Sequence, residues 1–346
     1  MRVDSFRVNA SRKRISGGGR KPLQGLLRFD IPYGKICEWL SSIYYLKNVR
    51  VEQMKTAIIT DTNSGMLPED AREHGIILLP MPVIIDGKEY KEHLDLTDEF
   101  FYEKQESGAE IVTSQPSVGE IADLWKKTLK EYDAIIHIPM SSGLSGSCQS
   151  AMMLAEDFDG KVQVVNNQRI SVTQRQSALD AKALADNGAE AAEIRKILED
   201  TKFDSHIYIM VDTLKYLKKG GRITPAAAMI AGVLNIKPIL QIQGEKLDTF
   251  SKCRGIKQAK KIMLDAVADG IEKEFGGISV SKPGAWVGLA HTQNFEAAEE
   301  FKKEAMERFP GFDVHVDQLP ISIACHIGKG SLALTCTGVL PGGVQY

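Results

Sequence analysis

Residues 140–150 have the sequence MSSGLSGSCQS, which is rich in hydroxyl groups and contains one thiol. The apolar run before it, YDAIIHIP, predicts a buried strand, and AMMLAEDF after it predicts a helix. Serine hydroxyls and free backbone N–H groups at a helix start can hold a carboxylate or a single phosphate. A serine on a sharp turn can also be a nucleophile, and serine is a common helix cap. The motif therefore has three interpretations: nucleophile, anion cradle or ordinary helix start.

Two further loops have the same composition. Residues 61–64 (DTNS) and 113–117 (TSQPS) also follow strand-like runs, and like residues 141–147 they contain no lysine or arginine. Ligands of parallel α/β sheets bind beyond the carboxyl ends of the strands, so we expect all three loops at one sheet edge. A nucleotide polyphosphate normally requires Lys or Mg²⁺ as well, and neither GxxxxGK[ST] nor GxGxxG after a strand is present. The three loops together favour one carboxylate or one phosphate as the ligand.

Ser145 is the candidate nucleophile of this pattern. GLSGS is not the GxSxG elbow of serine hydrolases, because Gly143 and Ser147 do not complete it. No aspartate and histidine follow in a persuasive triad order, and His137 lies in an apolar run typical of a core strand. An enzyme that uses Ser145, either a serine hydrolase or a phosphotransferase for a small substrate, is the alternative interpretation.

The C-terminal half supplies basic side chains beside glycines. In YLKKGGRI the pair Gly220-Gly221 suits the left-handed end of a helix and fixes the turn that displays Arg222. Arg254 in KCRG precedes another helix, and His326 in ACHIGKG stands beside a glycine loop. Such side chains either face solvent or approach an acidic group or a phosphate. No other His or Asp lies at ligand spacing from His326, so no metal site is predicted.

The elements that position these residues divide the chain near Ser205. Strand-like and helical runs alternate over residues 54–204, which predicts a mainly parallel, layered α/β domain. In residues 205–346 some strands are joined by hairpin-like turns, which predicts a second α/β domain with a mixed or antiparallel sheet. Within it, the apolar run TPAAAMIAGVL (224–234) predicts a buried helix or the wall of a narrow apolar tunnel.

Three local signals predict turns and helix starts. Asp86-Gly87 between strand-like runs predicts a tight hairpin. Thr97 is expected to cap the short helix LTDEFFYEKQESG. Ser117 and Glu120 have the spacing of a capping box at the start of a long amphipathic helix.

The first 53 residues differ from the rest in charge. They carry 11 Lys/Arg against 4 Asp/Glu, and the remainder carries 32 against 41. Residues 1–53 are therefore predicted to be an unstructured extension or a mis-assigned start, with translation beginning at Met54; a basic tail that binds RNA or a membrane is the functional alternative. The acidic remainder argues against nonspecific nucleic-acid binding, which depends on Lys/Arg at phosphates.

Composition places the chain among ordinary globular proteins, at 43% hydrophobic and 25% charged residues. Its five cysteines are scattered without paired or metal-ligand spacing, which predicts a reducing, cytoplasmic location. The longest apolar run, AAAMIAGVLNIKPIL, is interrupted by Asn235, Lys237 and Pro238 and is too short to span a bilayer. At most transient membrane contact is expected.

Several motifs together resemble the DegV family of bacterial fatty-acid-binding proteins. They are TDTNSG, TSQPS, SSGLSGS followed by QSA, LKYLKKGGRI, LNIKPIL, the RG of KCRG and H-x-G-x-G, and in this order they cover residues 54–340. The resemblance implies two α/β domains with a ligand tunnel between them that buries a long-chain fatty acid such as palmitate, stearate or oleate. It implies no catalysis and no other cofactor. The protein would present the carboxylate to a separate fatty acid kinase, which makes an acyl phosphate from ATP for phospholipid metabolism. A regulatory protein in which the lipid is only structural is a further interpretation.

The resemblance also assigns residues. Thr113 and Ser145 match the hydroxyls that hold the carboxylate, and His326 matches the histidine beside it. The full set of implied ligand-binding residues is Thr113, Ser114, Ser142, Ser145, Gly146, Arg222 and His326. Arg254 matches the arginine of the RG motif and is the candidate for contact with the kinase.

The chain departs from the family pattern at three places. Asn166-Asn167 stands where an Asp-Ser pair is usual, and Thr62 stands where serine is usual. The terminal motif, usually H-T-G-P-G, is H-I-G-K-G and introduces Lys329. These changes bear on chain-length preference and ligand choice, and Lys329 would either strengthen anion binding or point outward.

Overall fold

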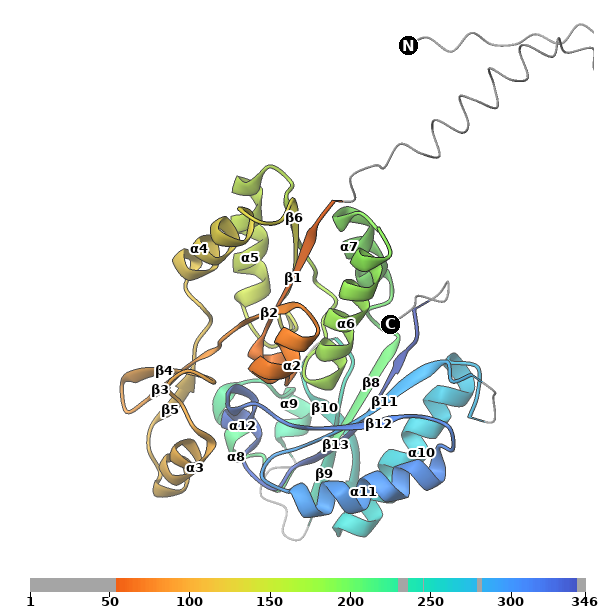
Figure 1. Ribbon diagram of the computed structural model, residues 1–346. Coiled ribbons are helices and arrows are strands. Elements are labelled where there is room, and N and C mark those ends of the chain that lie inside the picture. Colours follow the sequence, from red (N-terminus) through yellow and green to blue (C-terminus); the bar gives the residue numbers. More distant parts are fainter. Residues whose placement is uncertain (1–53, 230–235, 245, 279–281, 341–346) are drawn as a thin grey trace, which may run out of the picture. The chain divides into compact units, whose positions relative to one another are not determined.

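The computed structural model describes residues 54–229, 236–244, 246–278 and 282–340 (Figure 1). The predicted extension, residues 1–53, lies outside these ranges, as do residues 230–234 of the predicted apolar helix. All of the described ranges belong to one compact unit. In these ranges, no helix is both long enough and apolar enough to cross a bilayer.

A four-stranded parallel sheet forms the centre of the N-terminal half. Its strands in spatial order are β2 (Ile76–Leu79), β1 (Thr56–Asp61), β6 (Ala134–Ile138) and β7 (Val162–Val164). Around it lie η1 (Thr62–Ser64), α2 (Pro68–Glu73), α4 (Val118–Thr128), α5 (Ser147–Ala155), η2 (Glu156–Phe158), α6 (Val172–Asp186) and α7 (Ala191–Asp200). Ile58 and Ile136 pack with side chains of α6 and α7, whereas Ile59 and Ile135 pack with side chains of α4 and α5. Both faces of the sheet are therefore covered, as a parallel sheet requires, and the predicted parallel layer is confirmed.

A six-stranded mixed sheet forms the C-terminal half. Its order is β10 (Asp248–Cys253), β9 (Lys237–Ile242), β8 (Ser205–Met210), β13 (Leu332–Gly338), β11 (Ala285–His291) and β12 (Val314–Gln318), and only β11 and β12 pair in parallel. Helices α10 (Ile256–Glu274) and α11 (Phe295–Arg308) pack on one face, where Met210, Leu289 and Leu334 are buried. The short helices are α8 (Lys215–Gly220), α9 (Pro225–Ala228) and α12 (Ile321–Ile327). The predicted mixed sheet is confirmed; the division into two domains at Ser205, where β8 begins, stays a prediction.

A small antiparallel sheet corrects one expectation. It consists of β4 (Lys88–Lys91), β3 (Pro82–Ile85) and β5 (Ile111–Thr113), with α3 (Asp98–Ser107) beside it. The expectation that residues 113–117 lie at the edge of the parallel sheet is wrong, because β5 pairs with β3 instead. Proline has no N–H for a ladder, so Pro80 ends β2 and the run IILLPMPVII divides between two sheets.

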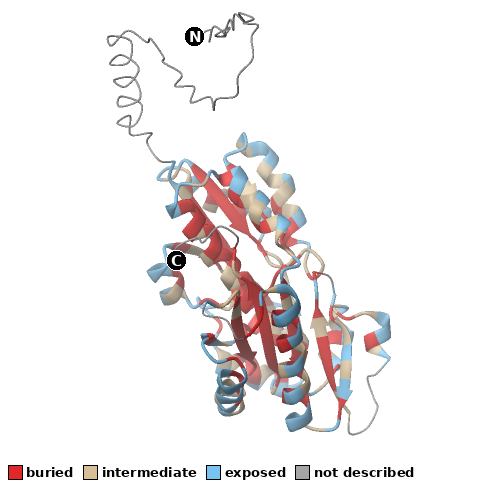
Figure 2. Cartoon of the chain, turned by 90° about the vertical axis from the view of Figure 1, so that its right-hand side faces the viewer, coloured by how far each residue is buried: buried red, intermediate tan, exposed pale blue. Residues whose placement is uncertain are grey.

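The local signals are all confirmed. Asp86 and Gly87 have φ of 49° and 81° and connect β3 to β4, as a type I′ hairpin turn requires. The Thr97 hydroxyl accepts a hydrogen bond from the N–H of Phe100 at the start of α3. Ser117 and Glu120 form the capping box of α4. Figure 2 shows that the buried residues follow the strands of the sheets.

Candidate functional site

A cavity of about 320 Å³ lies between the N-terminal and C-terminal halves. Its apolar wall comes mainly from the face of the six-stranded sheet opposite α10 and α11, including Ile207, Ile209 and Ala333. At its other side gather the residues that we call the polar end: Thr113, Ser114, Gln115, Ser145, Gly146, Arg222 and His326. Six of the seven residues implied for ligand binding thus line one cavity, and Ser142 is not among the lining residues.

Thr113 and His326 form a pair at the polar end. The Thr113 hydroxyl lies 2.9 Å from Nε2 of His326, so the last residue of β5 meets α12. Burial, together with the positive charge of Arg222, lowers the pKa of His326 to about 4. The imidazole is therefore neutral at neutral pH and contributes a donor and an acceptor, not a charge.

Gly220 is required for the position of His326. A Cβ on Gly220 would lie 2.4 Å from Nδ1 of the imidazole, which is far inside contact distance. The next residue, Gly221, has φ of 69° at the end of α8, as predicted from the GG pair. This turn carries Arg222, whose Nε donates to the Leu144 carbonyl at 3.2 Å and whose Nη1 donates to the Gly220 carbonyl. Arg222 is the only lysine or arginine among the described residues that line the cavity.

The loop 141–147 is held by its own serines. The Ser141 hydroxyl donates to the Gly244 carbonyl at 2.8 Å and accepts from the Gly143 N–H. Ser145 accepts a hydrogen bond of 3.2 Å from the N–H of Ser147, the first residue of α5. The N-cap position itself is Gly146, which has no side chain to cap the helix, so Ser145 supports the helix start from the residue before the cap. Its hydroxyl proton stays available for a ligand in the cavity.

His137 is a core residue, as expected. It is 1% exposed in β6 and packs edge-on against Trp125 with ring centroids 5.4 Å apart. Burial lowers its pKa to about 4.

A buried carboxyl behind the cavity was missed in the sequence. Glu92 is 1% exposed, and it accepts hydrogen bonds from the Thr62 hydroxyl and from the N–H of Ser322 at 2.6 Å. The Ser322 hydroxyl also donates to Oδ1 of Asn63 at 2.8 Å, and both Ser322 and Asn63 line the cavity. Burial raises the pKa of Glu92 to about 7. Asn63 belongs to the predicted loop 61–64, but Glu92 lies in the charged run KEYKEH, which resembles an ordinary solvent-exposed stretch.

Asp61 joins the first loop to the serine-rich loop. It is 2% exposed and accepts hydrogen bonds from the backbone N–H of Met140 at 2.8 Å and from the Gln174 amide at 3.1 Å. Its other donors are the backbone and side-chain amides of Asn63. Burial raises its pKa, while these hydrogen bonds act in the opposite direction. The two loops at the ends of β1 and β6 are therefore fixed to each other by one carboxylate.

A basic pocket, of about 360 Å³, also borders the Thr113 and His326 pair, and exposed residues such as Val112 belong to its lining. It shares Thr113, Arg222 and His326 with the cavity, and its lining includes Lys215 and Lys219. The polar end thus borders an apolar cavity on one side and a basic pocket on the other. This arrangement suits a ligand with one small anionic group and a long apolar part.

The remaining predicted residues lie away from the cavity. Arg254 is exposed just before α10, and Lys329 is exposed and paired with Glu106, so Lys329 points outward. The Asn167 amide donates to Ser177 at 2.7 Å inside the protein, and Asn166 donates its N–H to Glu199. Among the described residues, no group of three or more His, Cys, Asp or Glu could hold a metal ion.

Comparison with known proteins gives consistent matches. A family model described as "Uncharacterised protein, DegV family" matches residues 55–338. Protein DegV of Bacillus subtilis is 30% identical over 284 residues, which are 81% of this chain and 98% of that protein. The DegV domain-containing protein lin2658 of Listeria innocua is 32% identical over 286 residues, which are 81% of this chain and 98% of that protein.

Two solved structures share the fold. A DegV family protein from Thermus thermophilus, described for its fatty acid binding, matches with a TM-score of 0.75 at 27% identity, over 83% of this chain and all of that one. DegV of Bacillus subtilis, described as a fatty acid binding protein, matches with a TM-score of 0.73 at 28% identity, again over 83% of this chain and all of that one.

Proposed function

The chain belongs to the DegV family, and on this premise we propose that it binds a long-chain fatty acid and presents the carboxylate to a separate fatty acid kinase. The acid, such as palmitate, stearate or oleate, lies in the cavity, which forms the predicted tunnel between the two domains. The protein itself does not catalyse the phosphorylation. It holds the substrate from which the kinase makes an acyl phosphate.

One observation carries this proposal: the cavity combines an apolar wall with a polar end that holds one arginine. The donors at that end are the hydroxyls of Thr113 and Ser145, with Ser114 and the N–H of Gly146 beside them, and the charge comes from Arg222. A hydrogen bond that a carboxylate accepts is stronger than one between two neutral groups, so a few preorganised donors are enough to hold it. The neutral His326 orients Thr113, and the isoleucines enclose the acyl chain.

Native mass spectrometry of protein purified from its own host tests the lipid. We expect one bound species whose mass is that of a long-chain fatty acid. A spectrum that shows only ligand-free protein, or protein with a bound sugar, would count against the proposal.

Kinase contact is assigned to Arg254. It is exposed, lies away from the cavity and precedes α10, so its replacement leaves the lipid site unchanged. Arg254→Glu should abolish capture of the kinase in a pull-down while the fatty acid remains bound. Lys303→Glu on α11 is the control, because it makes the same change of charge at another exposed position. Equal capture by both variants would favour a protein in which the lipid is only structural.

A further inference from the structure

A second large cavity, of about 510 Å³, lies against the same face of the six-stranded sheet as the first. Its lining comes from α6, the end of α2, Asp313 and the strands β11, β12 and β13, and it combines charged side chains such as Lys182 with apolar ones such as Leu179. Thr335 in the middle of β13 lines both cavities and is 3% exposed. The two cavities therefore meet at this side chain.

The register of β13 shows how the cavities follow each other. Alternate residues of a strand point to one face, and on this face β13 presents Ala333, Thr335 and Thr337 in turn. Ala333 lines only the first cavity and Thr337 lines only the second. Because β13 follows α12 in the chain, and α12 carries His326, Ala333 is nearer to the polar end and Thr335 lies about 7 Å further along the strand.

Thr335 and Val172 form a wall between the two cavities. Gly288 of β11 pairs with Thr335, and a Cβ on Gly288 would lie 2.9 Å from the Thr335 hydroxyl and 3.0 Å from Cγ2 of Val172. Both side chains thus pack directly on the bare backbone of Gly288. The Thr335 hydroxyl donates to the Gly288 carbonyl at 3.2 Å, which fixes its rotamer. Val172, the first residue of α6, is 8% exposed and lines only the second cavity, so it stands behind Thr335 in a buried wall.

We propose that the wall of Thr335 and Val172 closes the far end of the acyl site and sets the longest fatty acid that this protein accepts. The inference rests on the proposed function. Both residues are β-branched and have little rotamer freedom, so the wall cannot move aside for an additional methylene. Where a methylene is accommodated, its burial improves affinity about fourfold. If one of the two side chains is shortened, acids that are too long for the first cavity should bind, because the second cavity begins directly behind the wall.

The test compares variants of the delipidated full chain against a series of saturated acids: myristate, palmitate, stearate, arachidate and behenate. Thr335→Ala and Val172→Ala should each raise the affinity for arachidate and behenate relative to palmitate, on the order of tenfold. Thr337→Ala is the matched control, because it removes the same side chain from the same strand face but lies about 7 Å beyond Thr335 along β13 and is not among the side chains packed on Gly288. Ala333→Leu should shift the preference to shorter acids.

The outcomes separate the two proposals. If the unchanged chain binds palmitate, and Thr335→Ala and Val172→Ala have the same length profile as Thr337→Ala, the wall does not set the length and this inference is wrong. If the unchanged chain binds none of the acids, the proposed function fails and this inference fails with it. If Thr335→Ala does not fold, Val172→Ala and Ala333→Leu decide the question from the two sides of the wall.

Discussion

At the scale of single residues, the side chains that could bind a ligand at the polar end already have at least one partner within the protein. Ser145 accepts from the Ser147 N–H, Thr113 is paired with His326, and Arg222 is held by the Leu144 and Gly220 carbonyls. Groups held in this way lose little further freedom when a ligand binds. The polar end is therefore preorganised for a carboxylate.

Replacement of Ser145 tests this arrangement. Ser145→Ala should weaken fatty-acid affinity by about 1–3 kcal/mol, because a buried charged acceptor would lose one donor. The variant should also lose about 1 kcal/mol of stability, because the hydrogen bond from the Ser147 N–H is removed. Displacement titration under conditions where both proteins are fully folded measures the first effect and urea unfolding the second. Ser147→Ala, in the same loop but outside the cavity lining, is the control, and equal affinity of both variants would contradict the role of Ser145.

The residues at the polar end could be predicted from sequence because short motifs carry them. Thr113, Ser145, Arg222 and His326 each stand beside a glycine or a run of hydroxyls, which marks a loop or helix start before any fold is known. Glu92 could not be predicted in this way. Its burial depends on packing between β4, the loop after β1 and α12, and these elements lie far apart in the chain.

At the scale of elements, α12 depends on Glu92 for its start. The helix has seven residues and carries His326 near its end. A carboxylate that accepts from the N–H of Ser322 satisfies one of the free donors of the first turn and interacts favourably with the helix dipole. The same carboxylate accepts from Thr62 in the loop after β1. Glu92 thus ties the histidine helix to the parallel sheet.

The buried Glu92 should make stability depend on pH. Its pKa is about 7 in the folded chain and near the usual value for glutamate when unfolded, so the folded state holds the proton more tightly. The resulting stabilisation is complete below the unfolded pKa and is lost as pH rises toward 7. Urea unfolding at pH 5 and pH 8 should show that the unchanged chain loses about 1–3 kcal/mol more than Glu92→Gln over this interval. If the free energy of unfolding changes equally with pH in the unchanged chain and in Glu92→Gln, this prediction is wrong. Glu89 is an exposed neighbour, so Glu89→Gln should behave like the unchanged chain.

The sheets illustrate what patterns of hydrophobicity can and cannot predict. Alternation of strands and helices correctly indicated a parallel sheet followed by a mixed one. The same patterns do not predict which strands pair with each other, because IILLPMPVII has the same apolar character on both sides of Pro80. Only the proline marks the break, and it does not say that β3 and β5 form a sheet of their own.

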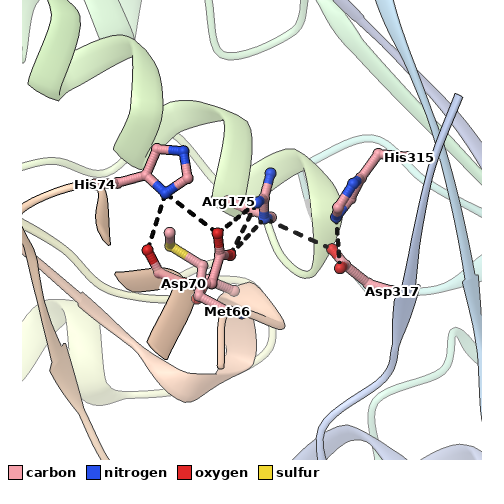
Figure 3. Close-up of polar contacts among 7 residues, drawn as sticks. Met66, Asp70, His74, Arg175, His315 and Asp317 are labelled. Carbon is pink, nitrogen blue, oxygen red and sulfur yellow. Dashed lines mark hydrogen bonds and ion pairs between the residues drawn. The ribbon is translucent and has the colours of Figure 1, made fainter. Parts of the chain in front are cut away.

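At the scale of the whole molecule, α6 connects the two large sheets. Gln174 donates to Thr60 and Asp61 at the end of β1, while Val172 packs on Gly288 of the six-stranded sheet. Figure 3 shows Arg175 between Asp70 and Asp317. Its guanidinium lies 2.8 Å from Asp70 of α2 and 4.0 Å from Asp317 of β12.

Removal of this connection should lower global stability. Arg175→Ala should cost about 1–3 kcal/mol, because the partly buried Asp70 and the more deeply buried Asp317 lose their arginine partner and keep only a histidine each. For a chain of this size the melting temperature should fall by roughly 1–2 °C per kcal/mol. Lys196→Ala breaks the exposed pair with Asp200 and should cost less than about 0.5 kcal/mol. Differential scanning calorimetry compares the two, and an equally small effect of both would show that α6 connects the sheets without Arg175.

The pair of Thr113 and His326 stands between an apolar interior and a basic pocket that opens outward, and this has a consequence for the physical chemistry of a fatty acid. A free long-chain acid is a surfactant, which partitions into bilayers or forms micelles and seldom stays as a monomer in water. An acid whose tail is enclosed while its carboxylate borders the outer pocket would react like a small, dilute, fully dispersed acid. Under the proposed function the protein would keep one fatty acid molecule dispersed as a monomer in water. A reaction at the carboxylate would then not require the acyl chain to leave the cavity.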